Sequence, residues 1–158
     1  MAADNRYVYE GMLLIQERDV NEVPVVSYMR GLDLSGGISG AGGIGGLLGR
    51  STHNASLPYA VNGSAFYYAD GNGNITARVT NAEALVANYK YDSYGRTLSA
   101  IGSLAGANRM CFSSQPMVLH SDASADRAFY YYGYRFYEPN SAKWLNRDPI
   151  YEMGTKHI

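Results

Sequence analysis

The residues of this chain whose types could do chemistry stand near its end, in an Arg-Asp-Pro at 147–149. Two carboxylates held close together can share a proton and activate water for peptide cleavage, one as base and the other as acid. Asp148 could supply one carboxylate, and Arg147 could orient or charge-balance the pair. The acidic residues available as its partner are Glu138, Glu152, Asp122 and Asp126. None of them lies in a recognisable second motif, so the sequence predicts an incomplete site and no enzyme.

Other chemistry has less support. Cys111 is the single cysteine, which excludes an intrachain disulfide and a thiolate metal site. The three histidines, at 53, 120 and 157, lie far apart without the spacing of metal ligands. The net charge is −1 with no basic block, which argues against a nucleic-acid surface. We therefore predict no metal, no cofactor and no nucleic acid.

A glycine pattern could suggest a nucleotide site. Gly40, Gly42 and Gly45 match G-x-G-x-x-G in form. A dinucleotide site also needs a preceding strand, a following helix and an acidic residue about 20 positions on. The run ends within four residues, in Leu-Leu-Gly-Arg, and no helical pattern follows. The stretch 35–56 is interpreted instead as a glycine-rich loop or linker.

An internal repeat indicates how the chain is built. The stretches 67–76 (YYADGNGNIT) and 90–98 (KYDSYGRTL) both have aromatic residues, then Asp, two residues and Gly. Asp70 and Asp92 are 22 residues apart, as are Gly73 and Gly95. An Asp can accept backbone N–H bonds across a turn, and Gly takes the positive-φ position. Each copy therefore predicts one β-hairpin, with these four residues at the turns.

Degenerate copies and further strands flank the pair. The stretch 7–19 has Glu10-Gly11 at its turn, and 134–145 has Glu138 where the repeats have Asp. The stretch 128–137 (AFYYYGYRFY) reads as one strand with an aromatic ladder. Helix is expected only in short pieces, such as 80–86 or 103–109. The residues expected to anchor the packing are Tyr91, Tyr132, Tyr134, Tyr137 and Trp144.

Composition agrees with an all-β chain of short strands and tight turns. The sequence has 158 residues, among them 15 Tyr and 18 Gly, with 46% hydrophobic residues. Tyr favours strands and Gly favours turns. We expect tandem hairpins in a curved or spiralling sheet, in a single domain 1–158. Its parts are the N-terminal strands (7–34), the glycine-rich segment (35–56), two repeats (64–112) and a C-terminal hairpin (127–150).

These motifs resemble those of Rhs/YD-repeat proteins, specifically their Rhs repeat-associated core region, from about Tyr7 to Ile150. The closest resemblance lies in the final third, YYYGYRFYEPNSAKWLNRDPI. The resemblance implies β-hairpin strips that spiral into a hollow shell around a toxin, as in insecticidal toxin complexes of bacteria. It also implies an aspartyl autoprotease built from two Asp-Pro motifs, which would release the enclosed cargo.

The chain departs from the family pattern at the implied protease. Arg147 and Asp148 match the first Asp-Pro motif, but Tyr151 stands where the family has Gly. The second motif would lie beyond Ile158. Arg147 and Asp148 are therefore interpreted as vestigial.

The resulting expectation is a non-enzymatic shell module that assembles with copies of itself through open β edges, into a tube, filament or other homo-oligomer. Other Rhs or toxin components are possible partners. Two alternatives stay open: a secreted or surface module that binds glycans or a protein partner, and a residual autoprotease. The N-terminus lacks the features of a signal peptide and no apolar run is long enough to cross a membrane. An extracellular or cell-surface location would need another export route.

Overall fold

The computed structural model describes residues 5–53, 63–119 and 128–149. Within them the chain forms two antiparallel sheets and one short 3-10 turn, η1 (Phe112–Ser114), so the prediction of an all-β fold of hairpins with little helix is confirmed. The large sheet contains β1 (Arg6–Glu10), β2 (Leu13–Arg18), β3 (Pro24–Arg30), β4 (Leu47–Thr52), β5 (Gly63–Ala69), β6 (Ile75–Thr80), β7 (Leu85–Tyr91) and β8 (Thr97–Ile101). The small sheet contains β9 (Met117–Leu119), β10 (Ala128–Tyr131), β11 (Phe136–Glu138) and β12 (Lys143–Trp144).

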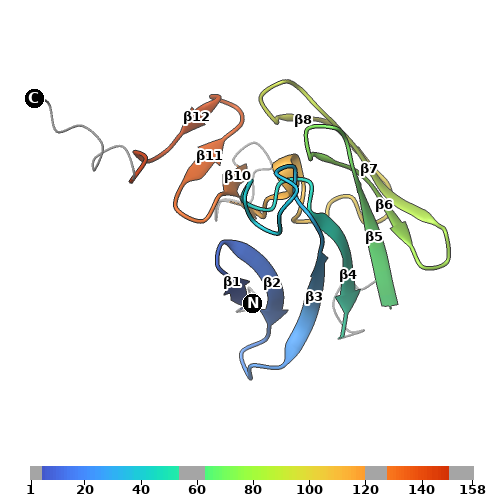
Figure 1. Ribbon diagram of the computed structural model, residues 1–158. Coiled ribbons are helices and arrows are strands. Elements are labelled where there is room, and N and C mark those ends of the chain that lie inside the picture. The colour runs from blue at the N-terminus through green and yellow to red at the C-terminus, as the bar shows by residue number, and fades with distance from the viewer. Residues whose placement is uncertain (1–4, 54–62, 120–127, 150–158) are drawn as a thin grey trace, which may run out of the picture.

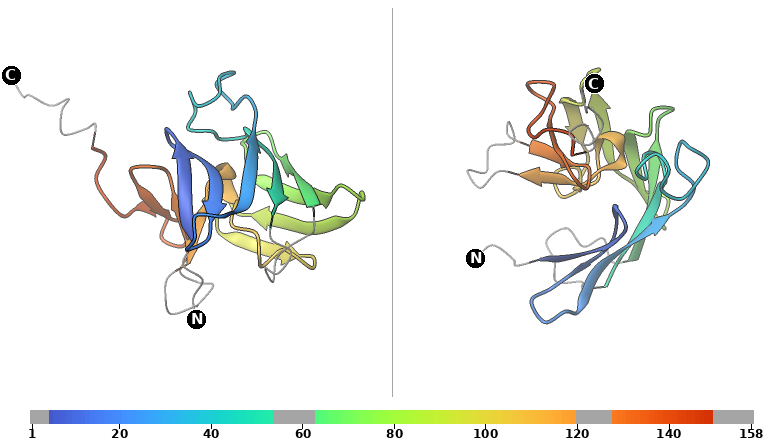
Figure 2. Two further views of the ribbon diagram at one scale, coloured as in Figure 1. Left: turned by 90° about the horizontal axis from the view of Figure 1, so that it is seen from below. Right: turned by 60° about the vertical axis from the view of Figure 1, so that its left-hand side comes forward.

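The large sheet is a meander in which each strand pairs with the next along the chain. Register shifts interrupt most of these pairs, for example at Val8/Tyr9 and at Tyr68/Ala69. Such bulges increase the local twist and bend the strands. The eight strands accordingly curve into an arc, and the small sheet lies on its open side (Figures 1 and 2).

The repeat turns have one backbone geometry. Asp70 Oδ1 accepts the N–H groups of Asn72 and Asn74 at 2.9 Å each, and the N–H of Gly73 bonds to the Asp70 carbonyl at 3.0 Å. Asp92 makes the same set of bonds one hairpin later, to the backbone of residues 94–96. Gly73 and Gly95 have φ of 80° and 87°. This is a type I turn followed by a left-handed residue, which suits the twist of a hairpin.

The same backbone bonds recur at three turns that the sequence reading missed. They begin at Asp19, Asp33 and Thr80, whose carbonyls each accept the N–H of the residue three positions on. The left-handed residues of all five turns are Glu22, Gly36, Gly73, Glu83 and Gly95. Because two of the five are Glu, the pattern Asp-x-x-Gly finds only part of the set.

Residues 105–115, called the cover segment below, cross the concave face of the large sheet. Tyr67 and Tyr89 donate their hydroxyls to Asn108 Oδ1 (3.1 Å) and to the carbonyl of Ala105 (2.8 Å). Ser114 Oγ donates to the carbonyl of Gly73 at 2.8 Å and accepts the N–H of Gly45 at 3.2 Å. The cover segment thus joins the strands, a repeat turn and the glycine-rich loop.

The glycine-rich segment is only partly a loop. Residues 35–46 form turns, whereas Leu47–Thr52 form β4, a strand inside the large sheet between β3 and β5. The expectation of a loop over all of 35–56 therefore fails for β4, because Leu47 and Arg50 are buried on the concave face. Residues 54–56 lie outside the described part of the chain.

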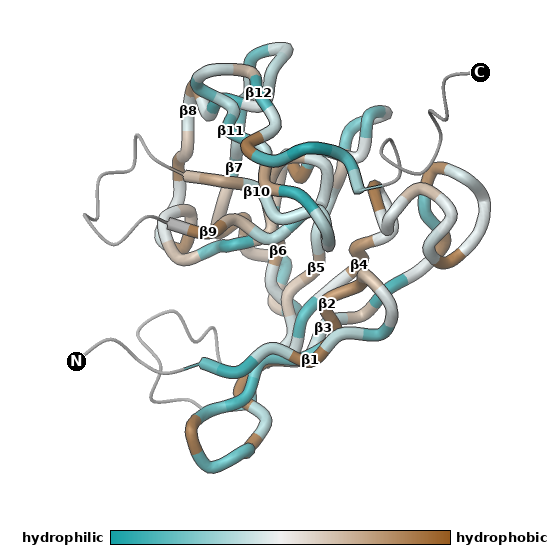
Figure 3. Tube along the Cα trace, turned by 90° about the vertical axis from the view of Figure 1, so that its left-hand side faces the viewer, coloured by the Kyte–Doolittle hydropathy of each residue, from teal (hydrophilic) through white to brown (hydrophobic). Residues whose placement is uncertain are grey.

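The stretch 128–137 also differs from the expected single strand. It forms a hairpin in which β10 ends at Tyr131, Gly133 takes a φ of 82° and β11 begins at Phe136. Neither 80–86 nor 103–109 is helical, since the first is a turn leading into β7 and the second consists of turns in which residue 108 enters the core. Hydrophobic and hydrophilic residues are interspersed along the described trace (Figure 3).

A single carboxylate organises the glycine-rich loop. Asp33 is 6% exposed, and its Oδ1 accepts both the N–H and the hydroxyl of Ser35. Its Oδ2 accepts the N–H groups of Ala41 and Gly43 at 2.7 and 3.1 Å. These hydrogen bonds, led by that from the Ser35 hydroxyl, lower the pKa of Asp33 from 3.8 to about 2.

Gly73 and Gly71 offer a matched test within one turn. A Cβ on Gly73 would lie 2.5 Å from Ile44 Cγ2 and 2.7 Å from the Gly45 nitrogen, whereas a Cβ on Gly71 would meet nothing within 4 Å. We expect Gly73→Ala to lower the free energy of unfolding by ~3 kcal/mol, through left-handed strain and overpacking. Gly71→Ala should change it by less than ~0.5 kcal/mol. Urea denaturation measures both, and equal effects would contradict the close approach of the two loops.

The role of Asp33 predicts a pH dependence. Its folded-state pKa lies below the unfolded value of 3.8, so its contribution to stability is complete above pH 3.8 and is lost as the pH falls through about 2. Asp33→Asn should be less stable than the wild type at pH 7, because an amide NH₂ would face backbone N–H donors. Denaturation between pH 7 and 2 should show this difference shrinking in acid. A constant difference would show that the carboxylate charge does not matter.

Candidate functional site

Asp148 takes part in a structural corner. Its Oδ2 lies 3.0 Å from Nη1 of Arg135, and the Arg135 guanidinium lies 4.0 Å from the centre of the Trp144 ring. Trp144 in turn contacts Tyr132 and Tyr137, at ring-centre distances of 5.0 and 5.3 Å. The cation that contacts Asp148 also stacks on an aromatic ring, so the contact holds Asp148 against the small sheet.

Of the remaining protease candidates, the structure describes Arg147 and Glu138. Arg147 is exposed, next to Asp148. The carboxylate of Glu138 accepts a hydrogen bond from Ser141 Oγ. Asp122, Asp126 and Glu152 lie outside the described residues.

Glu138 was expected at a repeat turn, and its surroundings differ from those of Asp70 and Asp92. It is the last residue of β11, and its described hydrogen bond comes from a side chain and not from backbone N–H groups. The turn that follows uses Ala142, with φ of 54°, as its left-handed residue. The carbonyl of Pro139 accepts the N–H of Ala142 at 3.3 Å, so this turn begins one residue after Glu138 and leaves Glu138 in the strand.

Four of the five expected packing anchors belong to one aromatic chain. Phe112 of the cover segment contacts Tyr91 (5.9 Å) and Tyr137 (6.4 Å), and Tyr137 leads to Trp144 and Tyr132. Tyr134 departs from the expectation: it is 71% exposed, because Gly133 turns the chain out of the core between β10 and β11.

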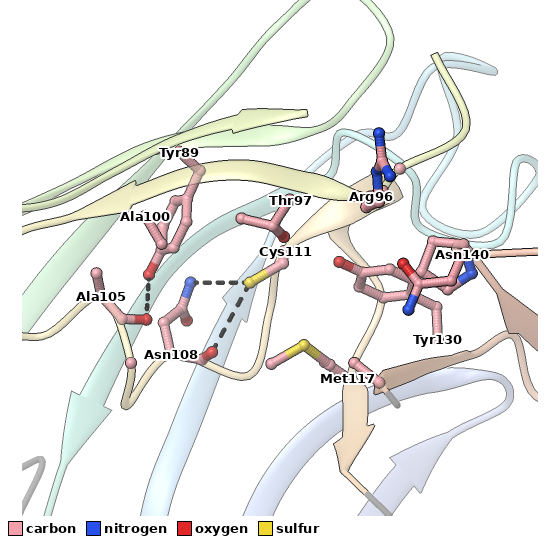
Figure 4. A pocket seen from close by; sticks show the side chains of 14 residues that line it. Tyr89, Arg96, Thr97, Ala100, Ala105, Asn108, Cys111, Met117, Tyr130 and Asn140 are labelled. Atoms are coloured by element: carbon pink, nitrogen blue, oxygen red, sulfur yellow. Dashed lines mark hydrogen bonds between the residues drawn. The ribbon is translucent and has the colours of Figure 1, made fainter. Parts of the chain in front are cut away.

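A cavity of about 340 Å³ lies between β8, the cover segment and β10 (Figure 4). It contains Cys111, the only thiol of the chain. Burial raises the pKa of Cys111 from 9.0 to about 12, so the group stays a neutral thiol at physiological pH. Its sulfur is instead within 3.7 Å of the side-chain nitrogen and the carbonyl of Asn108. The arrangement suits packing and gives no activated nucleophile.

The described residues contain neither a metal-binding cluster nor a membrane-spanning helix. No group of three or more His, Cys, Asp or Glu side chains is placed there to hold an ion. No helix there has the length and apolar character needed to cross a bilayer.

A row of buried polar side chains crosses the concave face, and sequence reasoning missed it. Tyr28 stands opposite Arg50 in the β3–β4 register, and Tyr67 stands opposite Arg78 in the β5–β6 register. The row runs across six strands as Glu17, Tyr28, Arg50, Tyr67, Arg78 and Tyr89, all between 0 and 8% exposed.

Arg78 is the least expected member of this row. It is fully buried, and its three guanidinium nitrogens have no hydrogen-bond partner among the described residues. Burial lowers its pKa. The alternation in β6 is inverted, since Ala77 and Val79 stand opposite the exposed Tyr68 and Phe66 on the convex face. The inversion follows from the register of β6 against β5, because shifting a strand by one residue would exchange its concave-facing and convex-facing residues.

The fold resembles solved structures, although sequence comparisons find no relative. No protein-family model matches the sequence, and no curated protein sequence matches it significantly. Solved structures are similar. They include the crystal structure of TcdB2-TccC3 (17% identity, TM-score 0.59), the same complex without its hypervariable C-terminal region (17%, 0.58) and the Tc holotoxin pore of Photorhabdus luminescens (16%, 0.60).

Each match covers 92% of this chain but only 6–7% of the matched chain. At such identity the likeness shows the fold alone. The coarse implication of the Rhs resemblance, a β fold of the kind found in toxin complexes, is confirmed. Assignment to the repeat-associated core region stays a prediction.

Removing the unpaired charge should stabilise the protein. An apolar residue of similar volume avoids the cost of burying a guanidinium without acceptors. We expect Arg78→Met to raise the free energy of unfolding by at least ~1 kcal/mol. The control Lys90→Met, at an exposed position of β7, should change it by less than ~0.5 kcal/mol. Urea denaturation decides, and a less stable Arg78→Met would show that the tyrosines around the guanidinium compensate its burial.

Proposed function

We propose that this chain is a non-enzymatic structural module, related in fold to toxin-complex shells, that associates with copies of itself through the open edges of its large sheet. The observation that carries the proposal is the edge strand β8. Four of its five residues are exposed, and its sequence, TLSAI, contains no charge and no proline. Natural edge strands usually carry such features to prevent pairing with other chains.

The opposite edge, β1, is better protected. Arg6 and Glu10 place charges at both ends of the strand, and a bulge interrupts its pairing between Val8 and Tyr9. Arg6 also forms an ion pair with Glu22. The contrast between the two edges makes β8 the strand expected to initiate contact.

The meander geometry favours a continuing assembly. In an antiparallel sheet of eight strands, β8 runs opposite to β1. The β1 strand of a second copy could therefore follow β8 in the same antiparallel manner, with both concave faces on one side. A head-to-tail contact of this kind that does not close gives a tube or filament.

The proposal also includes a location and partners for the module. The module acts outside the cell or at its surface, with copies of itself or other toxin-complex components as partners. Because the chain spans only 6–7% of the chains it resembles, these partners and this location come from fold likeness and have to be tested directly.

The alternatives have weaker support. The described contact of Asp148 is structural, which disfavours a residual protease. Five of the described tyrosines are exposed, and the other eight are at least partly buried, so packing accounts for most of the rings that a glycan would need.

A charge on the edge strand tests the proposal. Leu98 of β8 is 59% exposed, and Leu98→Lys should raise the dissociation constant of the assembly at least ~10-fold, or ~1.4 kcal/mol. The control is Tyr68→Lys, because Tyr68 is 56% exposed on β5, inside the sheet. Light scattering at micromolar concentration and negative-stain microscopy measure the assembly.

The possible outcomes separate edge contacts from face contacts. Loss of assembly with Leu98→Lys alone supports pairing through β8. Equal loss with Tyr68→Lys would place the contact on the convex face. A monomeric wild type without polymers would remove the proposal.

A further inference from the structure

A second cavity, of about 310 Å³, lies between the start of the large sheet and the small sheet. Its lining combines side chains from β1 and β2 with others from the cover segment and from β9–β11. The side chains that determine its chemistry are Tyr7, Tyr9, Glu17, Arg109, Tyr131 and Phe136. Aromatic residues therefore predominate around one carboxylate and one guanidinium.

Three of the rings form a concave wall. Tyr9 and Tyr131 meet edge to face, with ring centres 6.1 Å apart and planes at 76°. Tyr131 and Phe136 have centres 5.0 Å apart and planes at 39°. The ring planes therefore face in different directions, whereas a sugar ring packs best on a flat aromatic surface. The negative potential above each ring face attracts a cation.

Glu17 supplies the charge of this cavity. It is 4% exposed, and its Oε1 accepts a hydrogen bond from the Tyr28 hydroxyl at 2.5 Å. Among the described residues, its Oε2 has no hydrogen-bond partner. This oxygen is not among the fully buried atoms without a partner, so it stays accessible from the cavity, and a positive group beside it would gain the attraction of the carboxylate.

Tyr9 adds no competing charge. Burial, followed by repulsion between its ionised form and the neighbouring Tyr131, Tyr7 and Glu17, raises the pKa of Tyr9 from 10.0 to about 12. Its phenol is therefore neutral at physiological pH, and the wall around Glu17 keeps its uncharged ring faces.

We propose that this cavity binds a quaternary ammonium group, such as that of choline. The rings contact the methyl groups and the Glu17 carboxylate balances the charge. A primary ammonium, as on lysine, is strongly hydrated and needs three hydrogen-bond acceptors. The cavity offers one carboxylate oxygen, its other side-chain acceptors are phenol hydroxyls, and that of Tyr7 already accepts a bond from Arg109 at 3.3 Å. A weakly hydrated cation without N–H donors needs no such acceptors, so it suits this cavity better.

Arg109 limits the affinity. Its guanidinium lines the same cavity at the Tyr7 end and repels a second cation. Removing this charge while keeping a hydrogen-bond donor, as in Arg109→Gln, should strengthen binding several-fold. Glu17→Gln should weaken it at least ten-fold, since the amide oxygen can still accept from Tyr28 but the charge is gone.

The experiment titrates the isotope-labelled full chain carrying Leu98→Lys, a change outside this cavity that should prevent assembly, with choline and follows backbone amide shifts by NMR. A parallel titration uses 3,3-dimethylbutanol, a neutral molecule of the same shape, and a third uses Nα-acetyl-lysine methylamide. Choline should bind at least ten-fold more tightly than either, with shifts around β1, β2 and β10. The control variant Glu83→Gln, at an exposed turn, should bind like the wild type.

Several results would overturn this inference, and none depends on self-association. Equal affinity for the neutral isostere would show recognition of shape alone. Tighter binding of the lysine derivative would identify a primary ammonium site, and unchanged affinity of Glu17→Gln would exclude the carboxylate. Because the first two comparisons leave every cavity residue unchanged, they hold even if a cavity variant fails to fold.

Discussion

The concave face of the large sheet has to be covered, and the rest of the structure depends on the cover segment that does so. Its polar atoms bond to Tyr67 and Tyr89 inside the sheet, while Ser114 joins a repeat turn to the glycine-rich loop. Phe112 then links the sheet to β10 and β11 through contacts with the rings of Tyr91, Tyr130 and Tyr137. Without this segment the buried row around Arg78 would face water, and the two sheets would share far less apolar contact.

Some turns of the fold can be predicted from residue types, whereas other turns and one strand face cannot. The Asp70 and Asp92 hairpins were predictable because Asp and Gly occupy the two positions that the turn geometry demands. The related turns at Asp19 and Thr80 were not, because Glu22 and Glu83 adopt the left-handed conformation in place of Gly. In β6 Ala77 and Val79 point outward while Arg78 points inward, so alternation alone assigns the wrong face to these residues.

The candidate sites were harder to predict than the strands. Asp148 and Arg147 were identified from a local motif, but the partner of Asp148, Arg135, comes from the preceding hairpin. The aromatic cavity gathers Tyr9, Glu17 and Tyr131 from elements more than 100 residues apart. No sequence spacing encodes such proximity, since it arises only when the arc of strands brings β1 toward the small sheet.

The shared geometry of the five turns has a consequence for how such chains can change in length. A hairpin contributes two strands, so its gain or loss leaves the inward and outward sense of every later residue intact. Hairpins of this kind are therefore exchangeable units. The Asp70 turn is an exception, because Gly73 touches both Gly45 and Ser114. The Thr80 turn, with its neighbours 81–83 exposed, is where the module could lengthen without disturbing its core.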